Sequence, residues 1–79
     1  MAIYVEIVKV DETDANAEYS FGVSPGTVGR LSLDKANGSV RVVEALPDDA
    51  DSRYAARARQ KLLQHWRKGE IPDRTCWAS

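Results

Sequence analysis

The chain has 79 residues, of which 43% are hydrophobic, with two Trp, three Tyr and one Phe. That length accommodates a single small domain over residues 1–79, and that hydrophobic share excludes a disordered tail. Twelve acidic against eleven basic residues give a formal net charge of −1, which does not indicate the strongly basic balance of many nucleic-acid-binding proteins.

Cysteine usage and the N-terminal residues bear on location. Cys76 is the single cysteine, so neither an internal disulfide nor a zinc site with two cysteines can form. The first residues lack the basic and apolar regions of a signal peptide. No stretch approaches the roughly 18 apolar residues that a membrane-spanning helix needs. We therefore expect a soluble, cytoplasmic protein.

Two alternating segments near the N-terminus predict a first antiparallel pair of strands. Residues 2–10 and 17–23 alternate apolar and polar side chains and are separated by the turn-forming stretch DETDAN. In the first segment Ile3, Val5 and Ile7 share one face, and Tyr4, Glu6 and Val8 share the other. In the second segment Ala17, Tyr19 and Phe21 should face the core.

Two more strands are predicted around a hairpin. Residues 28–34 place Leu31 and Leu33 on one face, and residues 39–46 form the returning strand. The stretch SPGT at residues 24–27 indicates a turn, and Asn37-Gly38 favours a tight hairpin. Together these patterns predict a four-stranded antiparallel β-meander.

A helix is predicted to follow, from the acidic stretch PDDADS at residues 47–52 to Gly69. Asp48, Asp49 or Asp51 could accept hydrogen bonds from the first free N–H groups. Gly69 suits a left-handed cap, and Pro72 prevents continuation. This C-terminal amphipathic helix should pack on one face of the sheet, which makes the expected fold α+β.

The helical periodicity predicts which side of the helix faces the sheet. The core-facing stripe comprises Ala55, Ala58, Leu62 and Trp66, flanked by Tyr54, Leu63 and His65. Arg59 falls inside this stripe, where it would pair with Glu6 or Glu44, or stack on Trp66. After the helix, Ile71 should pack against it. Cys76-Trp77 should form a short extended piece that covers a sheet edge or the helix end.

The helix concentrates positive charge. Residues 53–68 carry six of the eleven basic residues and no acid, whereas the rest of the chain carries five bases and twelve acids. Such a face is either a solvated helix surface or an electropositive contact surface. The candidate contact residues on the solvent side are Arg53, Arg57, Gln60, Gln64, Arg67 and Lys68.

Catalytic and metal-binding motifs are weak. His65 and Cys76 would make a thiol enzyme if their side chains met in a cleft, but nothing in the sequence brings them together. The acidic loops lack the Gly and the closing Glu of a calcium loop, and SPGTVG lacks the Lys of a phosphate-binding loop. We therefore expect no enzymatic activity, no cofactor and no metal.

The pattern YSFG…GRLSLD…NGSV, followed by a Pro-Asp linker, RYAARARQKLLQHW and GEIP, resembles small single-domain bacterial proteins of unknown function. Some of these are presumed immunity proteins encoded beside polymorphic toxins. The resemblance covers most of the chain. It implies a cytoplasmic protein that binds and blocks another protein, and it implies no catalytic residues.

The resulting hypothesis is a non-catalytic protein-binding module, in the specific form a toxin-neutralising inhibitor, that uses the basic helix face or the opposite acidic loops, with the helix face as the expected contact surface. The alternative is a small nucleic-acid-binding protein that uses the same face, with an affinity that falls steeply with salt. No membrane partner is expected. A homodimer through an unpaired sheet edge is open.

Overall fold

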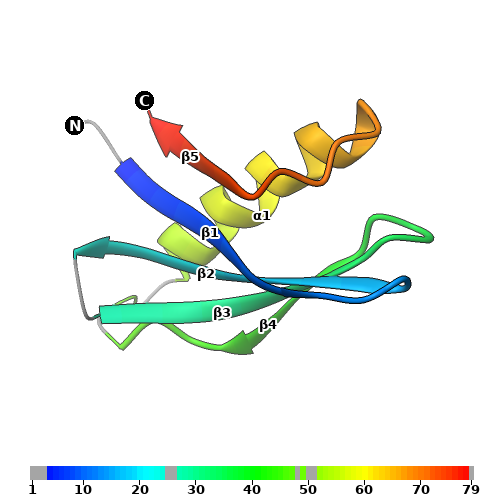
Figure 1. The fold of residues 1–79 in the computed structure, drawn as a ribbon. Helices are drawn as coiled ribbons and strands as arrows, with labels where there is room; N and C mark the ends of the chain where they lie inside the picture. Colours follow the sequence, from blue (N-terminus) through cyan, green and yellow to red (C-terminus); the bar gives the residue numbers. More distant parts are fainter. Residues whose placement is uncertain (1–3, 25–26, 48, 50–51, 79) are drawn as a thin grey trace.

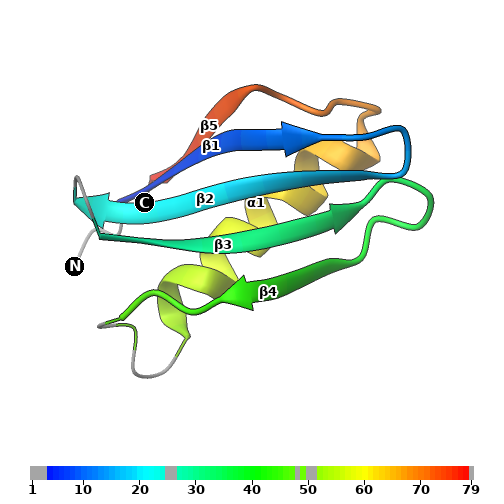
Figure 2. The ribbon, with the colours of Figure 1, turned by 60° about the horizontal axis from the view of Figure 1, so that its bottom comes forward.

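The structure, a computed structural model, describes residues 4–24, 27–47, 49 and 52–78. It contains one helix and five strands, namely β1 (Tyr4–Glu12), β2 (Asn16–Ser24), β3 (Thr27–Asp34), β4 (Val40–Glu44), α1 (Arg53–Arg67) and β5 (Arg74–Ala78). The strands form one antiparallel sheet in the order β4-β3-β2-β1-β5. The helix lies across one face of this sheet, and the other face is open (Figure 1, Figure 2).

The predicted α+β fold, with an antiparallel sheet and a helix across one face, is confirmed, but the predicted number of four strands is wrong. Residues 74–78 form a fifth strand that pairs with β1, so α1 is not the last element. The extended piece predicted around Cys76-Trp77 therefore covers the β1 edge of the meander. Its partner strand lies at the other end of the chain, so local sequence signals could not identify the pairing.

The core lies between the sheet and α1, where the predicted inward face of Ala17, Tyr19 and Phe21 is confirmed. Buried side chains come from β1, β2, β3 and α1, and Leu46 adds to them from the segment after β4. Ile3 and the Pro25-Gly26 turn lie outside the described residues. The buried set is Val5, Ile7, Ala17, Tyr19, Phe21, Leu31, Leu33, Leu46, Ala55, Ala58 and Leu62.

Both ends of α1 are capped. The Asp49 carboxylate accepts hydrogen bonds from the backbone N–H groups of Tyr54 and Ala55, at 3.2 and 3.0 Å, which satisfies N–H groups that have no partner within the helix. Of the three predicted capping acids, Asp48 and Asp51 lie outside the described residues. At the other end Gly69 has a φ of 77°, as predicted for a left-handed cap.

Two side-chain hydrogen bonds fasten the helix and the segment that follows it to the sheet. The Tyr19 hydroxyl donates to the Pro72 carbonyl oxygen at 2.7 Å, and Trp66 Nε1 donates to the Lys35 carbonyl oxygen at 2.9 Å. The Tyr19 bond helps to place β5 beside β1, and the Trp66 bond holds α1 against the β3–β4 hairpin. Within the described residues, no helix is long and apolar enough to cross a membrane.

Candidate partner-binding face

The outer side of α1 presents the predicted contact residues to solvent. Ala55, Ala58 and Leu62 point into the core, which turns the polar side of the helix away from the sheet. Five of the six predicted contact residues are exposed, and Arg57 alone is half-buried. The exposed five are Arg53, Gln60, Gln64, Arg67 and Lys68.

The positive charges of this face have no internal counter-charge in the described part of the chain. No ion pair among the described residues includes an Arg or Lys of α1, whereas Lys9, Arg30 and Lys35 of the sheet region each pair with an acid. An unpaired base on a surface is available to an external anion. Arg41 and Arg74 of the sheet are likewise in none of the described ion pairs, so the helix face differs from the sheet in the number of its unpaired charges.

A shallow depression of about 400 Å³ runs along the outer side of α1. Half-buried Leu63 and small Ala56 contribute its apolar part, and two arginines and two glutamines complete its lining. Such a mixture can contact both apolar and acidic groups of a partner. The two glutamines are Gln60 and Gln64, and the arginines are Arg59 and Arg67.

Arg59 is therefore not inside the core-facing stripe, as the sequence predicted, but exposed. The helix contacts the sheet through a narrow strip of Ala55, Ala58 and Leu62, and one residue turns an α-helix by about 100°. The residue after Ala58 is thereby carried out of the contact. Glu6 and Glu44 are exposed as well, and no ion pair described for the chain joins either of them to Arg59.

The cation–π contact expected at Arg59 is found at Arg57. Its guanidinium carbon lies 5.4 Å from the centroid of the Trp77 ring on β5, within the range of a favourable contact. Trp77 Nε1 is buried and has no hydrogen-bond partner among the described residues. Arg57 thus belongs to the boundary between α1 and β5 as well as to the basic face.

His65 joins α1 to the residues that follow it. Its Nδ1 lies 2.7 Å from Glu70 Oε1 and its Nε2 lies 2.9 Å from Thr75 Oγ1, and the His65 bond lowers the pKa of Glu70. The order carboxylate, imidazole, hydroxyl is also that of a hydrolase triad. Thr75 belongs to β5 and lies opposite buried Ile7 in the sheet, so the contact of His65 with Thr75 attaches β5 to α1.

Cys76 lies on the opposite face of the sheet from His65. In the β1–β5 register, Thr75 is opposite buried Ile7, whereas Cys76 is opposite exposed Glu6. Because successive side chains of a strand point to opposite faces, Thr75 faces α1 and Cys76 faces away from it. The two residues required for a thiol enzyme are therefore not brought together. The sequence did not predict that His65 contacts Glu70 and Thr75, because no sequence motif identifies these two residues.

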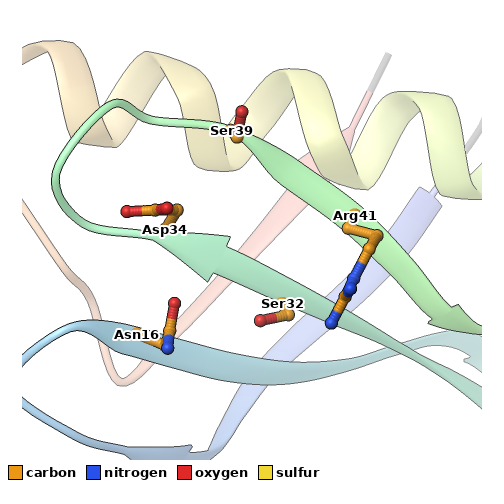
Figure 3. Close-up of a pocket in the computed structure, with 5 residues that line it drawn as sticks. All are labelled: Asn16, Ser32, Asp34, Ser39 and Arg41. Carbon is orange, nitrogen blue, oxygen red and sulfur yellow. The ribbon is translucent and has the colours of Figure 1, made fainter.

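The open face of the sheet carries polar depressions that the sequence analysis did not single out. One of about 260 Å³ lies over β2, β3 and the β3–β4 hairpin (Figure 3). It is lined by Asn16, Ser32, Asp34, Ser39 and Arg41. An adjoining one of about 160 Å³ adds Asp11, Glu12, Thr13 and Glu18. Acidic residues thus gather on the face opposite the basic helix. No group of three or more potential metal ligands occurs within the described residues.

No protein-family model, curated protein or solved structure matches this chain.

Proposed function

We propose that the chain is a non-catalytic protein-binding module whose basic helix face contacts an acidic surface of another protein. One observation carries the proposal: the bases of residues 53–68 have no counter-charge among the described residues, while three of the five bases elsewhere are ion-paired. A toxin-neutralising, immunity-type inhibitor is the specific form that the sequence resemblance favours.

The lining of the α1 depression favours a protein partner over a nucleic acid. Leu63 and Ala56 lie among Arg59, Arg67 and glutamines, and an apolar centre with a polar rim is typical of protein interfaces. Single-stranded nucleic acids are usually held by exposed aromatic rings. The aromatic residues of α1, Tyr54 and Trp66, are instead half-buried and pack against the core. The acids on the open sheet face would also repel a polyanion that extended beyond the helix.

A pair of charge-reversal variants tests the proposal. Arg53→Glu with Arg67→Glu reverses two exposed charges at the ends of α1, and Arg30→Glu with Arg41→Glu makes the same change in net charge on the open face of the sheet, away from β5. The tagged protein is used to capture partners from cells that express it, with and without nuclease treatment. We expect the helix variant to lose the captured protein, by about tenfold or more in affinity if each lost charge contact is worth 1 kcal/mol or more. The sheet variant should retain it.

Two outcomes would contradict the proposal. Equal capture by the helix variant and the unmodified chain would remove α1 from the interface. An oligonucleotide that binds at low salt, is released as salt rises, and is lost with the helix variant would instead support nucleic-acid binding. Unchanged far-ultraviolet circular dichroism of both variants shows that either result concerns binding and not folding.

A further inference from the structure

The outer edge of β5 offers backbone groups to a further strand. In the described part of the chain β5 is outermost and pairs with β1 alone. The Lys9 N–H donates to the Asp73 carbonyl oxygen at 2.8 Å, which makes these two residues a hydrogen-bonded pair. Since such pairs alternate along an antiparallel ladder, the N–H and C=O groups of Arg74 and Cys76 point away from β1.

The other edge of the sheet is less suited to strand addition. The register of β3 and β4 shifts between Arg30 and Leu31, which leaves Val43 of β4 without a partner. Bulges of this kind disrupt an edge and protect it from further pairing. All five residues of β5, by contrast, are in continuous register with β1.

The boundary between α1 and β5 holds two hydrogen-bond donors, one from each element, that have no acceptor in the described structure. Trp77 Nε1 is buried without a partner in the described structure, and the Arg57 guanidinium lies over the same ring. Both groups can donate hydrogen bonds and neither can accept one. A buried N–H without an acceptor is unfavourable, so this position is suited to a group that is acceptor-only.

Further positive charge lies on the flank of α1 that carries Arg57. Lys61 follows Arg57 by four residues and therefore lies beside it on the helix surface. One turn further, His65 contacts Thr75 of β5, which confirms that this flank faces β5. A segment along the β5 edge would therefore meet the charges of Arg57 and Lys61.

We propose that the protein partner contributes an extended acidic segment that adds to the free edge of β5 as a sixth strand. One of its carboxylates accepts hydrogen bonds from the Arg57 guanidinium, and the Trp77 ring turns so that its Nε1, buried in the free chain, donates to the same carboxylate. Strand addition supplies backbone hydrogen bonds, and a carboxylate is the acceptor-only group that these donors require. The inference rests on the proposed function, because it names the form in which the acidic partner meets α1.

Two synthetic peptides provide the probe: acetyl-Thr-Val-Asp-Val-Thr-amide and the neutral counterpart with Asn in place of Asp. Binding is followed by nuclear magnetic resonance of the two indole N–H groups, assigned with Trp77→Phe. We expect the acidic peptide to shift the Trp77 indole signal and to slow hydrogen exchange at Cys76. Trp66 should not shift, because its Nε1 already donates to the Lys35 carbonyl oxygen. The neutral peptide should bind about tenfold more weakly, because a hydrogen bond to a charged group is the stronger kind.

A strand-blocking variant gives an independent test. Cys76→Pro removes an outward N–H, a change that an edge strand tolerates, and Cys76→Val keeps that N–H. We expect binding of the acidic peptide to be lost with the first and kept with the second, while the Trp66 indole signal confirms the fold in both. If Cys76→Pro unfolds the chain, strand addition is judged from the unmodified chain alone, by whether the acidic peptide slows hydrogen exchange at Cys76.

Three results would overturn the inference. Unaltered Trp77 and Cys76 signals at millimolar concentrations of the acidic peptide would exclude the β5 edge as its binding site. Shifts confined to residues around Arg53 and Arg67 would place acidic ligands on α1 without strand addition, and would leave the proposed function intact. Protection of Cys76 that grows with protein concentration in the absence of peptide would identify a second copy as the occupant. Failure of the proposed function would be seen in a different experiment. There, the variant with Arg53→Glu and Arg67→Glu would capture the protein partner as well as the unmodified chain does.

Discussion

Glu12 shows how one side chain can link separate parts of a small sheet. Its two carboxylate oxygens lie 2.6 Å from Lys9 Nζ and 2.5 Å from Lys35 Nζ, and Lys9 also pairs with Asp73 at 2.8 Å. The hydrogen bonds from Lys35 and Lys9 lower the pKa of Glu12 to about 2. The bonds to Asp73 and Glu12 in turn raise the pKa of Lys9. The cluster joins β1, the β3–β4 hairpin and the connection to β5.

This lowered pKa predicts a pH dependence of stability. A Glu in an unfolded chain has a pKa of about 4.3, whereas the folded value for Glu12 is about 2. Folding therefore favours the ionised form, and its contribution is complete above the unfolded pKa and is lost as pH falls through 4 toward 2. In urea unfolding, Glu12→Gln should lower stability at pH 7, and its difference from the unmodified chain should shrink at pH 2.5.

The exposed Glu44 provides the matched control, since it belongs to none of the ion pairs of the described residues. Glu44→Gln should leave stability nearly unchanged at both pH values, because exposed charges contribute little. A Glu12→Gln deficit of the same size at pH 7 and pH 2.5 would show that the lysine contacts do not stabilise the folded chain.

At the scale of elements, the β3–β4 hairpin and α1 meet at Gly38. This residue has a φ of 77°, and a Cβ there would lie 2.6 Å from the Trp66 ring. The ring is held in place by its hydrogen bond to the Lys35 carbonyl oxygen. Gly69 also has a φ of 77°, but nothing lies within 4 Å of its Cβ position. An added Cβ would therefore meet an unfavourable backbone conformation at both glycines, but a steric clash only at Gly38.

Replacement of each glycine by Ala should destabilise the chain to different extents. Gly69→Ala should cost about 1 kcal/mol, from the left-handed backbone alone. Gly38→Ala should cost about 2–4 kcal/mol, because the displaced Trp66 ring adds an overpacking penalty. Urea unfolding of both variants measures the difference. Equal losses would mean that the hairpin can move away from α1 without cost.

The elements that the sequence predicted are those with a local signal. Alternation in β1 to β3 identified buried Tyr19 and Phe21, and the acid-rich stretch before α1 contained the cap Asp49. The predicted position of Arg59 was wrong because helical periodicity gives the direction of the core-facing stripe but not its width. The width depends on how closely Ala55 and Ala58 let the helix approach the sheet. The contact of Arg57 with Trp77 could not be predicted, since it requires knowing that β5 lies beside the helix.

At the scale of the whole molecule, the fold is completed by its two most distant strands. Tyr4 lies opposite Ala78 and Val8 lies opposite Arg74. Thr75 and Trp77 lie on the helix side, opposite fully buried Ile7 and Val5. Periodicity in the sequence cannot reveal such a pairing, because it encodes faces and not partners. Pairing β5 with β1 is opposed by the loop-closure entropy of two distant segments. This loss is offset because β5 covers the edge of β1 and part of the core.

Truncation after Asp73 tests how far the domain depends on this closure. It removes β5 and with it the bond from His65 to Thr75 and the contact of Trp77 with the core. A domain of this size has a total stability of about 4–12 kcal/mol, and loss of a half-buried Trp alone costs a sizeable part of the 3–5 kcal/mol measured for core aromatic residues. We therefore expect the truncated chain to lose its cooperative thermal transition by circular dichroism. Trp77→Ala in the untruncated 79-residue chain should keep that transition at a lower midpoint. A cooperative transition in the truncated chain near the original midpoint would show that β1 to β4 and α1 fold without β5, and that β5 serves mainly as the edge on which a partner strand is added.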